Sequence, residues 1–159
     1  MRVLFSGLIV LFLSSALAGA QPVKPREGWQ VFTTEFAYSA LIERLEAAVK
    51  AERMGLVTQA SASVGAEAQG FTIPGNRVVG VYRNDYARRM LAASVAAGIE
   101  APIRFYVTEN EDGGATLSWK TPSFVFAPYM DEGGDDLRTL AEELDGVFES
   151  IARRAVGGS

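Results

Sequence analysis

The sequence of 159 residues contains no cysteine and no histidine. Without cysteine, the chain can form no disulfide and offers no thiol nucleophile, so its hydrophobic core must hold the fold together. Without histidine, it can form no Ser-His-Asp triad and offers no imidazole ligand to a metal ion. The side-chain chemistry that remains open to it is that of carboxylates, lysine and tyrosine.

Positive charge is also scarce. The chain has 15 basic and 19 acidic residues, a net charge of −4, and its only lysines are Lys24, Lys50 and Lys120. Because it has no basic block, we expect binding neither to nucleic acid nor to anionic membrane surfaces. It also contains no G-x-G-x-x-G or P-loop motif, and we predict no cofactor.

The first twenty residues have the pattern of a secretory signal peptide. Arg2 gives a positive start, residues 3–13 form an apolar run, and Ala18-Gly19-Ala20 fits the small residues required at a cleavage site. The apolar run is shorter than the roughly 20 residues that a membrane-spanning helix needs. We predict cleavage after Ala20 and a periplasmic or secreted protein without a stable membrane span. The alternative is an uncleaved membrane anchor.

The rest of the chain alternates between strand-like and helix-like patterns, an order typical of an α+β fold. The predicted elements are a strand at 29–34, a helix at 39–54, strands at 56–64 and 77–82, a helix at 86–97, strands at 103–109 and 115–120, and a helix at 135–156. Apolar-polar alternation implies a sheet packed on one face only. We therefore predict a mainly antiparallel sheet with helices on one face, forming a single domain over 29–156. A linker at 21–28 precedes this domain, and a tail at 157–159 follows it.

Single residues predict where the first two helices begin and end. Ser39 is the expected cap of the first helix, and Asn84 or Asp85 that of the second. Gly55 and Gly98 are expected to end them, because glycine accepts the left-handed conformation that often follows a helix.

An acidic stretch at 131–136 precedes the last helix and contains four carboxylates. A hard cation could use such oxygens, but their spacing does not match an EF-hand loop. Asp135 and Asp136 also complement the positive end of the helix dipole. We therefore predict a helix cap here and no metal site.

Residues at two places are candidates for a ligand-binding site. Tyr82 and Arg83 lie at a strand-to-helix junction, where the arginine could clamp a carboxylate or phosphate near a helix N-terminus. Tyr106 falls on the opposite side of its strand from Phe105, and Lys120 ends the next strand. Each place also has a structural explanation, either an ordinary capped junction or a solvated strand end.

The apolar stretch Thr121–Met130 adds two further candidates. Pro122 is expected to end the preceding strand, because proline cannot donate a hydrogen bond to a sheet. The spacing of Phe124 and Phe126 predicts a short extended crossing that buries both rings. Tyr129 and Met130 follow at its exposed end and are candidates for the rim of a pocket or for a partner's contact.

Four stretches carry a further signal: EFAYSALIERLEAAVKAERMGLV, RVVGVYRNDYARRML, PIRFYVTENEDGGATLSWKTPS and LAEELDGVFESIARRAV. Through them, residues 33–156 resemble the DUF302 family of small bacterial domains. The resemblance rests on the order of elements and on scattered positions. It implies an α+β fold of the TBP-like type, with a curved antiparallel sheet gripped by helices, often in a dimer. It implies no reaction.

The chain departs from many cytosolic relatives of this family at one point. Those proteins have a cysteine in the strand before the second helix, whereas this chain has none in the corresponding residues 79–84. A thiol-based role therefore does not carry over.

Three functional hypotheses follow. The first is a non-enzymatic domain that binds a small apolar or amphipathic molecule between the long helix and the sheet. The second is a homodimeric or partner-binding subunit that uses the apolar stretch 121–130 as its contact. The third is an enzyme that uses Lys120, Glu109 or Tyr106, which the missing residue types disfavour.

Overall fold

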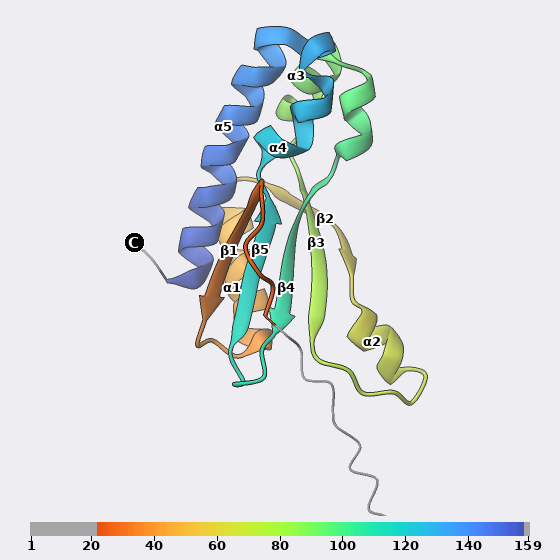
Figure 1. The fold of residues 1–159 in the computed structure, drawn as a ribbon, viewed down its shortest axis with the longest axis vertical. Helices are drawn as coiled ribbons and strands as arrows, with labels where there is room; N and C mark the ends of the chain where they lie inside the picture. The colour runs from red at the N-terminus through yellow and green to blue at the C-terminus, as the bar shows by residue number, and fades with distance from the viewer. Residues whose placement is uncertain (1–21, 158–159) are drawn as a thin grey trace, which may run out of the picture.

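The computed structural model describes residues 22–157, which are built around an antiparallel sheet of five strands (Figure 1). The strands are β1 (Trp29–Thr34), β2 (Gly55–Ala60), β3 (Asn76–Tyr82), β4 (Ile103–Glu109) and β5 (Ala115–Lys120). They lie in the order β1-β5-β4-β3-β2, and each neighbouring pair is antiparallel. β1 and β2 are therefore the two edges of the sheet.

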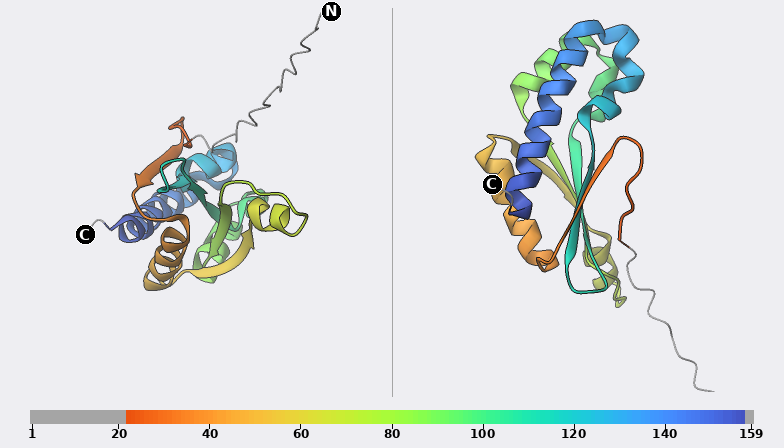
Figure 2. Two further views of the ribbon diagram at one scale, coloured as in Figure 1. Left: turned by 90° about the horizontal axis from the view of Figure 1, so that it is seen from below. Right: turned by 60° about the vertical axis from the view of Figure 1, so that its left-hand side comes forward.

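The two longest helices, α1 (Tyr38–Ala51) and α5 (Met130–Val156), cover one face of the sheet (Figure 2). Leu45 of α1 and Phe148 of α5 are buried in the same core as Phe105 of β4. The rings of Phe105 and Phe148 stack with their centroids 4.7 Å apart. The predicted α+β fold, with helices on one face of an antiparallel sheet, is confirmed.

The first helix begins and ends differently from the prediction. Ser39 lies inside α1, and the residue at the cap position is Ala37, which makes no side-chain capping bond. After the helix, Arg53 adopts the left-handed conformation, with a φ of +57°. Gly55, the expected helix stop, instead begins β2.

Short helices form a cap at one end of the sheet (Figure 1): α3 (Asn84–Ala93), η1 (Ala96–Glu100), α4 (Pro122–Phe126) and η2 (Ala127–Tyr129). The prediction of one helix over 86–97 was wrong at both ends. Asn84 and Asp85, the expected caps, lie inside α3, and Arg83 at the cap position makes no side-chain capping bond. Gly98, the expected helix stop, lies inside η1. α3 stops before Ser94, whose buried hydroxyl accepts a hydrogen bond from the Ala97 amide at 3.1 Å. Leu91 and Val95, two apolar residues at this end, are 45% and 75% exposed.

A helix that the sequence did not predict follows β2. The strand expected over 56–64 ends at Ala60, and residues Ala62–Glu67 form α2. The Ser61 hydroxyl caps α2 by accepting a hydrogen bond from the Val64 amide at 3.3 Å. The Ala62 amide donates to Asn76 Oδ1 at 2.9 Å, which ties α2 to the start of β3.

The stretch predicted as an extended crossing is instead the helix α4. Pro122 occupies its first turn, and the Thr121 hydroxyl accepts a hydrogen bond from the Phe124 amide at 3.3 Å. In a helix, residues two apart point in different directions, whereas in a strand they share a face. Phe126 is accordingly buried, but Phe124 is 40% exposed, and its ring occupies the space that a side chain at Gly28 would need.

The long helix α5 is interrupted near its start. Gly134 has φ +56° and ψ −147°, so residues 130–133 form a separate turn before the regular helix. That regular part begins at Asp135, where the sequence predicted the helix to start. Among the residues that the structure describes, no helix is long and apolar enough to cross a membrane. The predicted signal peptide and cleavage site lie outside the described residues.

Candidate binding site

The open face, defined as the side of the sheet away from α1 and α5, carries the outward residues of each strand. β4 shows the alternation most clearly. Phe105 and Val107 point to the core and are fully buried, while Arg104 is exposed and Tyr106 is half-buried on the other side. The placement of Tyr106 opposite Phe105 therefore follows from the period of two along a strand.

Strand register brings two rows of side chains side by side on the open face. In the first row, Trp29 of β1 is opposite Lys120 of β5. Arg104 and Lys120 each lie one residue beyond the last β4–β5 pair, Phe105 and Trp119, so they are neighbours across these two strands.

The second row lies two residues further along each strand. Tyr106 of β4 is opposite Ser118 of β5 on one side and Val78 of β3 on the other. Val78 is in turn opposite Ala60 of β2. The first row is thus rich in cations, and the second is mainly apolar.

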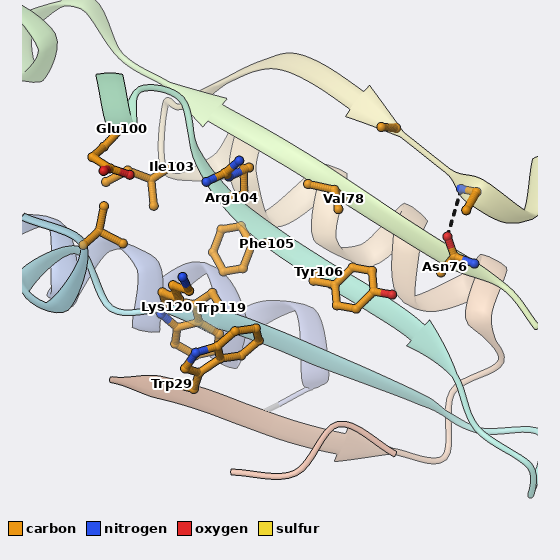
Figure 3. A pocket seen from close by; sticks show the side chains of 13 residues that line it. Trp29, Asn76, Val78, Glu100, Ile103, Arg104, Phe105, Tyr106, Trp119 and Lys120 are labelled. Atoms are coloured by element: carbon orange, nitrogen blue, oxygen red, sulfur yellow. Dashed lines mark hydrogen bonds between the residues drawn. The ribbon is translucent and has the colours of Figure 1, made fainter. Parts of the chain in front are cut away.

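These rows line a cavity of about 520 Å³ (Figure 3). The lining of this cavity includes the side chains of Trp29, Val78, Glu100, Arg104, Tyr106 and Lys120. In Figure 3, Tyr106 lies between the cluster of Trp29 and Lys120 and the more distant Asn76. The cavity therefore extends across the sheet from β1 to β3, with Ala60 and Ala62 at its far side.

The segment 22–28, predicted as a linker, runs along the open face without helix or strand structure (Figure 2). A turn joins it to β1, because the Trp29 amide donates to the Arg26 carbonyl at 3.0 Å. The Arg26 guanidinium lies 5.0 Å from the centre of the Trp29 ring, and Lys120 Nζ lies 5.9 Å from it. This end of the cavity thus joins an aromatic ring to positive charge.

The two cations of the first row have no anionic partner within residues 22–157. Neither Arg104 nor Lys120 forms an ion pair or a side-chain hydrogen bond there. The carboxylate in the cavity lining, Glu100, instead accepts a hydrogen bond from the Tyr129 hydroxyl at 2.8 Å. This bond raises the pKa of Tyr129. The cavity therefore presents two cations whose charge is available to a ligand.

The structure brings some of the predicted candidates together. Tyr106 and Lys120 line the cavity, and Tyr129 reaches its edge through Glu100. Met130 is half-buried and packs against the hydrophobic core.

The other two candidates lie at a different place. Tyr82 and Arg83 line a separate cavity of only about 40 Å³ beside the cap. Arg83 precedes Asn84, the first residue of α3, and holds Asp85 with two hydrogen bonds of 2.7 and 3.0 Å. These bonds lower the pKa of Asp85. The guanidinium also lies 4.0 Å from the ring centre of Tyr86. The Arg83 side chain, which was predicted to bind a ligand, therefore binds the carboxylate of Asp85 instead.

Glu109, named with Lys120 and Tyr106 in the enzyme hypothesis, has a structural contact. Its carboxylate accepts a hydrogen bond from the Gly75 amide at 2.7 Å, at the opposite end of β4 from Arg104. In the described part of the chain, no group of three acidic, histidine or cysteine side chains gathers as a metal site would require. The acidic stretch 131–136 forms the first turns of α5, and the residue at the cap position of this helix, Tyr129, makes no side-chain capping bond, so the cap predicted from the acidic stretch was wrong.

Sequence reasoning predicted Tyr106 and Lys120 of the cavity lining and missed the other residues, among them Arg104, Trp29 and Glu100. Arg104 could have been found, because alternation places it on the same face as Tyr106. Trp29 and Glu100 could not have been found in this way. Trp29 lines the cavity because of the order of the strands, and Glu100 because of the position of the cap.

Residues 30–151 match the sequence model of a family described as "Domain of unknown function DUF302". The chain belongs to the DUF302 family. The fold agrees with that of a solved relative, the crystal structure of an uncharacterized conserved DUF302 protein from Bacillus stearothermophilus. The superposition has a TM-score of 0.72 at 18% sequence identity and covers 82% of this chain and 99% of the other.

At this level of identity, the likeness between the two DUF302 proteins shows a shared fold and does not extend to individual side chains. No curated protein matches the chain. The function of this DUF302 domain must therefore be argued from its own cavity.

Proposed function

We propose that this DUF302 protein is an exported, non-enzymatic binding protein that holds a small amphipathic molecule in the open-face cavity. The observation that carries the proposal is the size and lining of that cavity. Its volume of about 520 Å³ lies within the roughly 300–1,000 Å³ of small-molecule sites. Its lining combines four aromatic residues and aliphatic side chains with a few polar groups, as such sites commonly do.

The cavity is not where the sequence suggested. The space between the long helix and the sheet is filled by core side chains. Leu137, Leu140 and Phe148 of α5 are 0 to 1% exposed, which leaves no room for a ligand on that face. Within residues 22–157, no helical layer covers the open face, so its half-buried residues can contact a ligand.

Binding alone is the proposed activity because the lining offers anchoring groups rather than an activated nucleophile. A catalytic lysine or tyrosine commonly has a hydrogen-bonded base or acid beside it. Within residues 22–157, no side chain hydrogen-bonds Lys120, and none hydrogen-bonds the Tyr106 hydroxyl. Export is proposed from the signal-like residues 1–20 alone.

A neutral fluorescent probe tests this proposal. We expect phenylnaphthylamine to bind the mature chain saturably, with a rise in its fluorescence as it leaves water. Val78→Glu places a carboxylate in the second, mainly apolar row of the cavity lining. This substitution should weaken binding of the probe by about tenfold, because the carboxylate must lose its hydration when the apolar probe binds.

Val57→Glu is the matched control. Val57 is 51% exposed on the edge strand β2 and does not line the cavity, so this variant should bind the probe like the wild type. Circular dichroism establishes that both variants are folded. Absence of saturable binding to the wild type, or equal binding by the two variants, contradicts the proposed function.

A homodimer that uses the stretch 121–130 stays a prediction. Phe126 is part of the core, so within this stretch the aromatic surface left for a partner comes from Phe124 and the half-buried Tyr129. Replacing both phenylalanines would therefore unfold the chain rather than separate two subunits.

A further inference from the structure

Two cations stand side by side on the open face. Arg104 and Lys120 occupy neighbouring positions on β4 and β5, one residue beyond the Phe105–Trp119 pair of that hairpin. Like charges directly across two strands destabilise a sheet. Within residues 22–157, no carboxylate forms an ion pair with either of them. The arrangement is unfavourable for the empty protein and favourable for a protein that holds an anion.

We infer that the ligand of the open-face cavity is an amphipathic anion, with a flat apolar body that carries a carboxylate or a similar acidic group. This inference rests on the proposed function and narrows its ligand class. The acidic group would lie between Arg104 and Lys120. The apolar body would lie over Tyr106 and Val78.

The spacing of the two rows sets the shape of this ligand. Residues two apart on a strand are separated by about 7 Å. The acidic group is therefore held about 7 Å from the middle of the apolar row, a distance comparable to the length of two fused aromatic rings. The half-buried ring of Tyr106 lies next to the cation row and gives the apolar body a flat surface to stack on.

Of the other two charged groups near the cavity, Arg26 favours an anionic ligand and Glu100 opposes one. Arg26 stands on the segment that crosses the open face, with its guanidinium 5.0 Å from the Trp29 ring. Glu100 is the opposing charge in the lining, and its carboxylate is engaged by the Tyr129 hydroxyl. Because the chain as a whole carries a net charge of −4, this group of cations is a local exception on an acidic protein.

Two probes with nearly the same skeleton separate the charge from the apolar body. Anilinonaphthalene sulfonate carries one negative charge, and phenylnaphthylamine is its neutral counterpart. The readout is the ratio of their affinities for the mature chain. We expect the sulfonate to bind about tenfold more tightly, since two exposed ion pairs together supply about that factor. Added salt should reduce this ratio, because it screens charge and leaves the apolar contact in place.

The double variant Arg104→Gln and Lys120→Gln should bring the ratio close to one. The matched control, Lys50→Gln with Arg88→Gln, removes the same charge from exposed residues of α1 and α3, neither of which lines the cavity. Its ratio should stay that of the wild type.

The outcomes distinguish this inference from the proposed function. If both probes bind but the ratio is near one in the wild type, the anion site is refuted and the binding function stands. The same holds if both double variants lower the ratio equally. If neither probe binds saturably, the proposed function itself fails, and the inference fails with it. Binding of the sulfonate alone, lost in the Arg104 and Lys120 variant, would mean that the two cations bind an anion without the apolar contact, and it would contradict both the proposed function and the amphipathic ligand.

Discussion

Two glycines of the long helix α5 should respond in opposite directions to the same substitution. Gly134 and Gly146 both have open space where a Cβ atom would be placed, with no other atom within 4 Å. Sterically, alanine fits at either position. The two differ in backbone conformation alone, because Gly134 has φ +56° and ψ −147° whereas Gly146 lies in the regular helix.

The expected magnitudes follow from these conformations. At Gly134, an alanine would be forced into a region that is almost restricted to glycine, which costs about 1 to 3 kcal/mol. At Gly146, an exposed position in a helix interior, alanine should raise the free energy of unfolding by about 0.5 to 1 kcal/mol, because glycine loses more backbone entropy on folding. The two variants should therefore differ by about 1.5 to 4 kcal/mol.

Urea denaturation followed by far-UV circular dichroism measures this difference. Gly134→Ala should have a lower midpoint than the wild type, and Gly146→Ala a higher one. If Gly134→Ala is as stable as the wild type, the break in α5 does not depend on glycine. If both variants shift in the same direction, backbone conformation is not the cause of the effect.

Two further predictions concern stability. Glu52 accepts hydrogen bonds from the Ser150 hydroxyl at 2.6 Å and from Arg154 Nε at 3.0 Å, and these bonds lower its pKa from the ordinary value of 4.5. Glu52→Gln should therefore reduce the free energy of unfolding by about 1 kcal/mol at neutral pH. The difference in free energy of unfolding between Glu52→Gln and the wild type should vanish as the pH falls through the lowered pKa of Glu52, because the contact stabilises the fold only while the carboxylate is charged. A difference that persists in acid would argue against this contact. Phe126→Ala should lower the free energy of unfolding by about 3 to 5 kcal/mol because the Phe126 ring is buried. Phe124→Ala should lower it by only about 1 to 2 kcal/mol because the Phe124 ring is half-exposed. Thermal unfolding measures both changes, and equal losses would contradict the helical geometry of α4.

The sequence predicted best those elements whose signal is local and regular. β1, β4 and β5 have the predicted bounds, because apolar-polar alternation continues through each strand and a turn with two glycines joins β4 to β5. The regular part of α5 was also predicted, because its apolar stripe is long and acidic residues precede it.

Short segments were predicted less well, because a few apolar residues fit more than one period. The spacing of Phe124 and Phe126 suggested a short extended crossing, although Thr121 and Pro122 in front of them are typical of a helix start. Most of the six residues of α2 are small, the helix has no apolar stripe, and none of its residues is buried. No pattern in the sequence marks such a helix.

The cavity shows a different limit of sequence reasoning. Tyr106 and Lys120 were predicted because the orientation of a residue on a strand depends only on its neighbours in the chain. That Lys120 lies beside both Trp29 and Arg104 depends on the order of the strands in the sheet. This order is fixed by the packing of the whole core, which no single segment encodes.

The position of β1 at the edge beside β5 has a consequence for folding. The Thr34 hydroxyl donates to the Ala115 carbonyl, 81 residues away in the chain. Because synthesis proceeds from the N-terminus, the first strand to be made is without its partner until nearly the whole domain exists. β2, β3 and β4 pair over shorter separations and can assemble earlier, because closing a short loop costs less entropy. The sheet is thus completed by β1, the first of its strands to be synthesised. Until β1 pairs with β5, its apolar residues Trp29 and Phe32 need protection from aggregation.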